Sequence, residues 1–174
     1  MRLVNLFLGL LLCVALATPV LATDAGQYTL GPGDKMRVTV FGEPHLSGKF
    51  LVNANGTIAM PLIEPIAVNG LTLNQTEAEI RKALSAGFMG NPRVSVDILE
   101  YRPFFIIGEV IEPGRYPYVA DMTVLHAVAI AGGFTPRAAK NKIVMQRDGK
   151  EDLPVSNSTP VQPGDIITVK ERFF

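Results

Sequence analysis

The chain has 174 residues, which allows one domain or two small ones, and its 16 basic and 16 acidic side chains give a formal net charge of zero. A chain this close to neutral has no electrostatic reason to seek nucleic acid, so we exclude a nucleic-acid partner. A single cysteine cannot form a disulfide within the chain, and it also excludes a metal site built from several cysteines.

Residues 1–22 have the pattern of a secretory signal peptide. An apolar run follows Arg2, and Val20 and Ala22 hold the small-residue positions of a cleavage site. The apolar run is too short for a transmembrane helix, although an uncleaved N-terminal anchor is the alternative. We therefore predict cleavage after Ala22, which removes Arg2 and Cys13 and leaves 15 basic against 16 acidic residues.

Turn residues and alternating runs predict a first unit of strand, hairpin, helix and strand. A Pro-Gly-Asp turn at 32–34 precedes an alternating strand at 35–41, and Asn55-Gly56 predicts a type I′ hairpin. Between residues 71 and 87 the apolar period becomes helical, with a capping-box pair at the start and a glycine at the end. An alternating strand at 93–101 completes the unit.

Residues 103–174 predict a second unit of short strands around one small helix. The nearly all-apolar run “FFIIGEV” predicts a strand buried on both faces, and Pro113-Gly114 predicts a type II turn with positive φ at Gly114. Thr123 precedes a short helix, and Asp148-Gly149 predicts another hairpin. A second Pro-Gly-Asp turn at 163–165 precedes the closing strand.

This order of elements predicts an α+β fold whose second unit is β-grasp-like, with a sheet wrapped around one helix. The Arg102-Pro103 step is the natural seam, so we expect a signal peptide at 1–22 and domains at 23–102 and 103–174. In each Pro-Gly-Asp turn we expect Pro-Gly to make the turn and Asp to accept a hydrogen bond from the next backbone amide.

Residues that carry chemistry are sparse in this sequence. His45 and His126 are the two histidines, and a lone histidine in an apolar helix, as His126 is, predicts a packed or rim residue rather than a ligand. The Gly31-x-Gly33 pair leads into a strand, so no helix N-terminus would be available to a phosphate. No catalytic or metal-binding motif is present, and we predict no enzymatic activity, no cofactor and no metal.

Aromatic residues gather around the seam, and packing between the two units is the ordinary interpretation. Stacking against a sugar is the more specific alternative for Tyr116 and Tyr118, which we take as candidate glycan contacts. The other members of this zone are Tyr101, Phe104 and Phe105.

Two long stretches resemble a known family. “YTLGPGDKMRVTVFGEPHLSGKFLVNANGTIAMPLI” and “GLTLNQTEAEIRKAL” are similar to the N-terminal domain of bacterial polysaccharide export proteins, the Wza-type outer-membrane polysaccharide exporter family. “NPRVSVDILEYRPFFIIGEVIEPGRYPYVADMTVLHAVAIAGGF” is similar to the start of a soluble-ligand-binding β-grasp (SLBB) domain, with its Gly-Glu-Val, Pro-Gly-x-Tyr and Ala-Gly-Gly landmarks. The resemblance covers nearly all of residues 27–171.

The resemblance implies a ring of identical subunits that guides capsule or exopolysaccharide across the periplasm towards the outer membrane. It implies the polysaccharide polymer and an inner-membrane polysaccharide co-polymerase as partners, and it brings no catalytic residue. Larger members often carry a lipidated cysteine and a C-terminal amphipathic helix that lines a pore. Here Leu12 precedes Cys13 where a lipobox requires Gly or Ala, and the sequence ends at Phe174 soon after the last strand.

We therefore expect an unlipidated periplasmic protein, associated with the outer membrane, that depends on a separate outer-membrane channel. A homo-oligomeric conduit for polysaccharide export is the first hypothesis for its function. The alternative is a monomeric periplasmic module that binds a soluble ligand such as a glycan. A glycan-hydrolysing enzyme is disfavoured, because the sequence marks out no pair of carboxylates.

Overall fold

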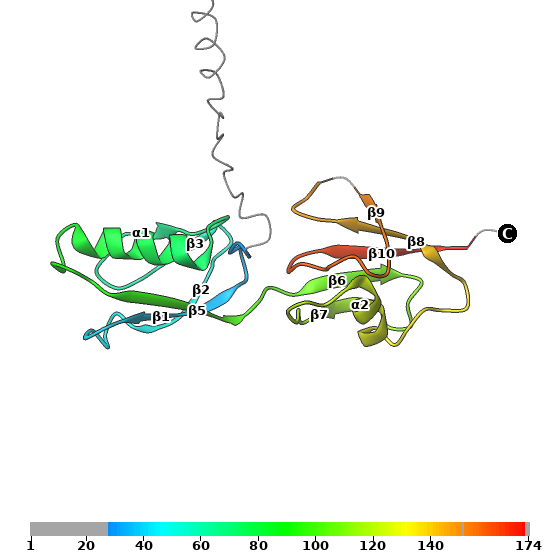
Figure 1. Ribbon diagram of the computed structural model, residues 1–174, viewed down its shortest axis with the longest axis horizontal. Coiled ribbons are helices and arrows are strands. Elements are labelled where there is room, and N and C mark those ends of the chain that lie inside the picture. The colour runs from blue at the N-terminus through cyan, green and yellow to red at the C-terminus, as the bar shows by residue number, and fades with distance from the viewer. Residues whose placement is uncertain (1–27, 151, 173–174) are drawn as a thin grey trace, which may run out of the picture.

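The computed structural model describes residues 28–150 and 152–172, which form two domains side by side along the long axis of the molecule (Figure 1). Each domain has its own sheet and its own hydrophobic core, and no strand of one sheet pairs with a strand of the other. The segment between strand β5, Val94–Glu100, and strand β6, Phe104–Gly108, joins them (Figure 1). The predicted α+β class and the order of the two domains are confirmed.

The N-terminal domain is built on an antiparallel sheet with the strand order β2-β1-β5. Met36, Val38 and Val40 alternate along β1 and are fully or almost fully buried, as the apolar alternation predicts. The small ladder of β3 and β4 completes the domain. These strands span Lys35–Val40 (β1), Gly48–Leu51 (β2), Thr57–Ile58 (β3), Ile66–Ala67 (β4) and Val94–Glu100 (β5).

Helix α1, Leu73–Ser85, lies against this sheet and buries Ile80 and Leu84 in its core (Figure 1). The predicted capping box is confirmed, because the Thr72 hydroxyl accepts from the amide of Gln75 while the Gln75 side chain accepts from the amide of Thr72. One side chain on the helix also reaches the sheet: Glu77 accepts a hydrogen bond of 2.9 Å from the amide of Val96 in β5.

The predicted type I′ hairpin at Asn55-Gly56 is wrong. Strand β2 pairs with β1 and β3 pairs with β4, and Gly56 has a positive φ of 74° while Asn55 does not. The turn is held by the Asn53 side chain, whose Oδ1 accepts from the amides of Asn55 and Thr57, each at 3.0 Å. A side chain thus closes the loop where we expected a two-residue turn.

The C-terminal domain is a sheet of five strands in the order β7-β6-β10-β8-β9, with β6 and β10 parallel at its centre. Helix α2, Val124–Ile130, covers one face, and Val124, Ala127 and Val128 enter the core. This arrangement is β-grasp-like, as expected. The strands span Phe104–Gly108 (β6), Gly114–Tyr116 (β7), Ala138–Gln146 (β8), Leu153–Val155 (β9) and Ile166–Glu171 (β10).

Strand β6 is buried on one face only, which corrects the prediction of burial on both. Phe104 and Ile106 are inaccessible to solvent, whereas Phe105 is 40% exposed and Ile107 is 45% exposed. The reason is that α2 covers a single face of the sheet, so an apolar run in a central strand does not guarantee a second covering layer.

The prediction of positive φ at Gly114 is also wrong. Gly114 pairs with Ile106 and begins strand β7, so its backbone is extended. The bend between the strands is instead made at Gly108, which has a φ of 86° and where a Cβ atom would lie 2.1 Å from the carbonyl oxygen of Val169. By contrast, the turn at Asp148-Gly149 is confirmed, with positive φ at both residues between β8 and β9.

The predicted signal peptide and its cleavage site lie outside the described residues. Within residues 28–150 and 152–172, neither helix is long and apolar enough to cross a membrane. The domain boundaries at residues 22, 102 and 174 stay predictions.

Candidate functional site at the domain junction

The two Pro-Gly-Asp sequences fold into the same turn, one in each domain. In residues 31–34 and 162–165 the amide of the fourth residue donates to the carbonyl of the first, with N···O distances of 3.1 and 3.2 Å. The third residue of each turn, Gly33 or Gly164, has a φ of 97° or 88°. Proline at the second position and a positive φ at the third define type II turns, as the Pro-Gly pairs predict.

Asp34 and Asp165, the last residues of these turns, are fully buried. Each carboxylate accepts a hydrogen bond from the amide of the first residue of its turn, at 2.7 Å from Gly31 and 2.6 Å from Gln162. The expected bond to the next amide along the strand is not formed, because the side chain folds back over the turn. A buried carboxylate of this kind needs a cation as well as hydrogen bonds.

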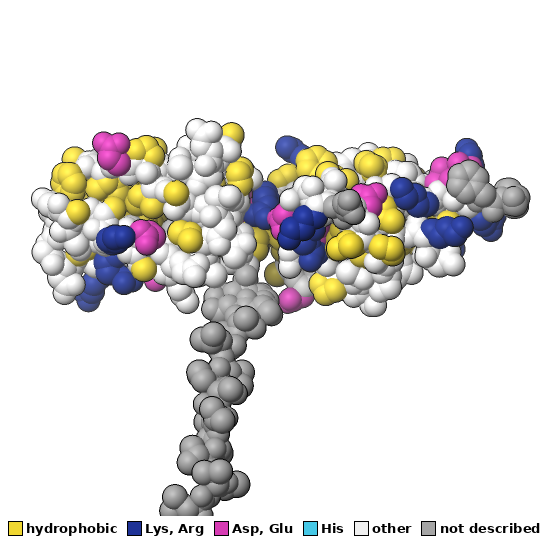
Figure 2. Space-filling model, turned by 90° about the horizontal axis from the view of Figure 1, so that it is seen from above, with side chains coloured by type: hydrophobic (Ala, Val, Ile, Leu, Met, Phe, Trp, Pro, Cys, Tyr) yellow, Lys and Arg dark blue, Asp and Glu magenta, His cyan; other side chains and the backbone are white. Residues whose placement is uncertain are grey.

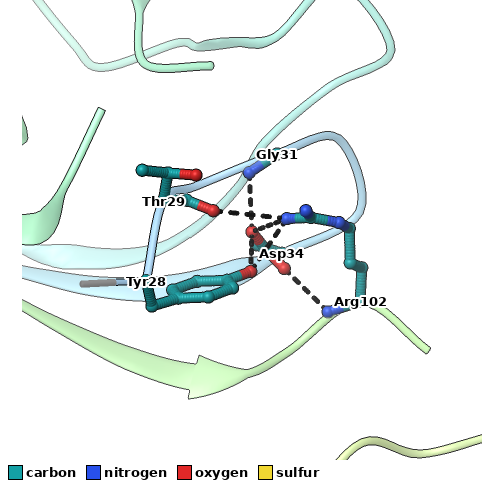
Figure 3. A network of polar contacts seen from close by, with 5 residues as sticks. All are labelled: Tyr28, Thr29, Gly31, Asp34 and Arg102. Atoms are coloured by element: carbon teal, nitrogen blue, oxygen red, sulfur yellow. Dashed lines mark hydrogen bonds and ion pairs between the residues drawn. The ribbon is translucent and has the colours of Figure 1, made fainter. Parts of the chain in front are cut away.

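Arg102 supplies that cation to Asp34 (Figure 3). Its Nη1 lies 3.1 Å from Asp34 Oδ2, and its backbone amide donates to Asp34 Oδ1 at 2.7 Å. The same Nη1 donates to the Tyr28 hydroxyl at 2.9 Å and to the Thr29 carbonyl at 3.4 Å. Figure 3 shows Tyr28, Gly31 and Arg102 converging on the Asp34 carboxylate, from the segment that leads into the turn and from the seam. The seam residue is therefore fixed to the first Pro-Gly-Asp turn.

Arg147 has the corresponding role in the C-terminal domain. Its Nε and Nη2 donate to the two carboxylate oxygens of Asp165, both at 2.8 Å, and Nη2 also donates to the carbonyl of Pro160 at 3.1 Å. The hydrogen bonds to Asp165 raise the pKa of Arg147 above its usual value. The bidentate pair links the end of β8 to the turn that begins β10.

Arg102 also lies between the two turns, and the glycines of both turns make room for it. A Cβ atom at Gly31 would lie 2.6 Å from its Nη1, and one at Gly164 would lie 2.9 Å from its Nε. The amide of Gly164 donates to the carbonyl of Pro103 at 3.1 Å. We call this arrangement of Arg102 with turns 31–34 and 162–165 the Arg102 clamp.

Three tyrosine rings form a second link across the seam. Tyr28 meets Tyr101 edge-on with ring centroids 4.9 Å apart, and Tyr101 meets Tyr118 in the same way at 5.2 Å. Burial, together with the hydrogen bond to the Asp34 carboxylate, raises the pKa of Tyr28, and burial raises that of Tyr118. Because Tyr118 packs against the core of the C-terminal domain, this ladder connects the two domains.

Tyr116, the other candidate glycan contact, stacks on the buried ring of Phe104 with centroids 6.0 Å apart. Its hydroxyl donates to the carbonyl of Glu112 at 2.6 Å. Tyr116 and Tyr118 thus both make packing contacts, while Tyr116 also lines a shallow cavity of about 330 Å³ between the domains, beside Arg115. Glycan contact by these two residues stays a prediction.

The described residues hold no group of three His, Cys, Asp or Glu side chains that could bind a metal ion. His126 is a capping residue of α2, because its Nδ1 accepts from the amide of Thr123 at 3.1 Å. This contact at an exposed position fits the prediction of a packed or rim residue. The contacts described at the junction are ion pairs, hydrogen bonds and aromatic packing.

Comparisons with known proteins agree with this two-domain arrangement. Residues 22–99 match the family described as polysaccharide biosynthesis/export protein, and residues 103–156 match the SLBB domain. The chain belongs to the polysaccharide export protein family. The seam at Arg102-Pro103 falls between the two matched segments of this export protein.

Two curated relatives extend the comparison. The exopolysaccharide production protein ExoF of Rhizobium meliloti (strain 1021) is 33% identical over 174 residues, covering 92% of this chain. The polysialic acid transport protein KpsD of Escherichia coli is 29% identical over 127 residues, covering 71% of this chain. The export protein spans 40% of the length of ExoF and 23% of the length of KpsD. These names describe production and transport rather than an enzymatic reaction.

Arg102 and Arg147 were not predicted as partners of the two Pro-Gly-Asp turns. The repeated Asp is the feature of the sequence that could have indicated such partners. Each Asp precedes a strand, and an Asp that is buried there needs a cation to compensate its charge. Which cation it finds depends on residues 68 positions away for Asp34 and 18 positions away for Asp165. Sequence spacing does not contain that information.

Proposed function

We propose that the protein is a periplasmic component of a machine that exports capsule or exopolysaccharide, in which it forms or adapts part of the conduit to the outer membrane. The observation that carries this proposal is an export domain and an SLBB domain held to each other by the Arg102 clamp. A subunit that forms part of the wall of a conduit has to keep its two domains in one orientation. The Arg102 clamp meets that need, because it holds the residue between the domains against a turn of each domain.

We further propose that the protein acts as a homo-oligomeric ring. A closed ring of identical subunits needs two different surfaces on each copy that fit one another. Both domains expose apolar side chains suited to such contacts (Figure 2): Leu62 and Phe88 beside an apolar cavity of about 610 Å³ along α1, and Phe105 and Ile107 on the open face of the C-terminal sheet. Exposed apolar surface of this kind is typical of interaction sites.

The polysaccharide polymer, an inner-membrane polysaccharide co-polymerase and a separate outer-membrane channel are the proposed partners. The polymer follows from the export family, and the two proteins would supply the steps before and after passage through the periplasm. We assign no catalytic residue, since the Asp34 carboxylate and the Tyr28 hydroxyl at the junction are bonded to each other and to Arg102. The names of the relatives also describe production and transport.

Deletion of the gene tests the export role. We expect surface polysaccharide to be lost while synthesis of its repeat unit continues, and we expect a plasmid copy of the gene to restore export. Normal secretion in the deletion strain would reject the proposal. Crosslinking in cells tests the ring. If secretion is lost in the deletion strain but the protein stays strictly monomeric when crosslinked, the monomeric ligand-binding module is favoured instead.

A further inference from the structure

The start of β8 and the end of β10 lie at the end of the C-terminal domain that is farther from the junction (Figure 1). Residues of segment 134–142, together with Arg172, line a groove of about 580 Å³ there, which we call the tip groove. Three cationic side chains line it, Lys140, Lys142 and Arg172, together with the ring of Phe134. Its volume falls within the roughly 300–1,000 Å³ of typical small-molecule sites. Neither the junction nor the proposed self-association surfaces use these residues.

The charge of its lining separates this groove from the other three cavities described. The cavity along α1 includes Glu64 and Glu79, and the two cavities near β1 both include Glu100. The tip groove has no carboxylate in its lining. Figure 2 shows Lys and Arg side chains gathered towards this C-terminal end of the molecule, with acidic side chains beside some of them.

Two carboxylates next in sequence or bonded to residues of the groove already have partners. Glu171 pairs with Arg137, and Glu109 accepts a hydrogen bond from the Thr135 hydroxyl. Among the described residues no carboxylate forms an ion pair with Lys140 or Lys142. Two cations at the groove are therefore available to an anionic ligand.

The backbone of β8 is irregular at this point. From Ala138 to Ile143 the strand advances five residues, while its partner β10 advances two, from Val169 to Glu171. The extra residues of this bulge include both lysines, which are exposed, while Ala138 and Ala139 are buried. Bulges re-aim side chains and are common beside functional sites.

The groove also offers groups suited to a sugar ring. Lys140 Nζ lies 5.9 Å above the centre of the Phe134 ring, and that half-buried ring gives an apolar surface beside the cations. Asn141 and Thr135 add an amide and a hydroxyl to the lining. An apolar ring with a few polar groups is the usual composition of a small-ligand site.

We infer that the tip groove binds a carboxylate-bearing sugar, so that the transported polymer is an acidic polysaccharide that contacts the protein there. The lysines at positions 140 and 142 pair with the sugar carboxylate, and Phe134 packs against the carbon face of the ring. This inference rests on the proposed export function and adds the chemical class of the polymer to it.

Titration of the purified protein with tetragalacturonate, followed by NMR shift changes or calorimetry, tests the site. We expect saturable binding, loss of binding to neutral maltotetraose, and at least tenfold weaker binding in the Lys140→Gln/Lys142→Gln double variant. Lys49→Gln/Lys82→Gln is the matched control, because it removes the same charge from exposed positions elsewhere, and it should change affinity less than twofold. Phe134→Leu should weaken tetragalacturonate binding while leaving the melting temperature within a few degrees.

Three results would overturn the inference: no saturable binding of tetragalacturonate, equal loss of affinity in the control variant, or equally tight binding of a glutamate tetrapeptide, which would assign the groove to an acidic protein segment. The same double variant expressed in the deletion strain separates this inference from the proposed function. Normal export by a variant that no longer binds would reject the groove's role in transport and leave the export function intact, whereas normal secretion in the deletion strain itself would reject the export function.

Discussion

At the scale of single residues, two buried aspartates organise the molecule. Asp34 and Asp165 each complete a type II turn, accept an amide of that turn and pair with an arginine from a different segment. Burial of a carboxylate is costly unless hydrogen bonds and a cation compensate for the lost solvent. The Pro-Gly-Asp sequence therefore acts as a long-range contact point as well as a turn.

The first prediction concerns Asp34→Asn. The new side-chain amide has no charge to neutralise Arg102, and its NH2 group faces neighbours that are themselves hydrogen-bond donors. We therefore expect the free energy of unfolding to fall by about 2–4 kcal/mol. Glu100→Gln is the matched control, since Glu100 pairs with Lys35 at 2.7 Å with both side chains more than half exposed. It should cost less than about 1 kcal/mol. Urea unfolding of both variants measures the difference, and equal losses would mean that burial of Asp34 has no energetic consequence.

At the scale of the elements, local signals predicted some structures well. The capping box of α1 and the Asp148-Gly149 turn both depend on residues within four positions of one another, and both are present. The exposed face of β6 and the extended backbone of Gly114 were mispredicted, because each depends on which strand or helix lies alongside. Similarly, the sequence predicted aromatic packing at the seam but not the ion pairs of Arg102 and Arg147 with the two turns, because each arginine comes from a distant segment.

A pair of glycine substitutions tests the corrected loop. Gly108→Ala should destabilise the C-terminal domain by about 3 kcal/mol or more, since the new Cβ would collide with the carbonyl oxygen of Val169 at a positive φ. Gly114→Ala should change stability by less than about 1 kcal/mol, because the strand is extended and the nearest atom, in the Tyr116 ring, is 3.8 Å away. Thermal unfolding compares the two. A larger loss in Gly114→Ala would restore the type II turn that we reject.

At the scale of the whole molecule, we infer that the two domains keep one relative orientation. Their sheets share no strand pairing, so the connection rests on the Arg102 clamp and the tyrosine ladder. Interfaces between domains in one chain usually permit relative motion unless they are large and apolar. A clamp that fixes the linker residue from both sides is a different way to restrict that motion.

Double electron–electron resonance tests this inference, because it measures the distance between a spin label in one domain and a spin label in the other. The two labels are attached at exposed positions through Ser85→Cys and Asn157→Cys. The substitution Cys13→Ser removes the cysteine of the natural sequence. Dilution with unlabelled protein removes distances between subunits. We predict one narrow distance distribution, broadened by Arg102→Ala but unchanged by Arg115→Ala, which removes an exposed arginine of the neighbouring cavity. A broad or multiple distribution in the unmodified junction would contradict the account.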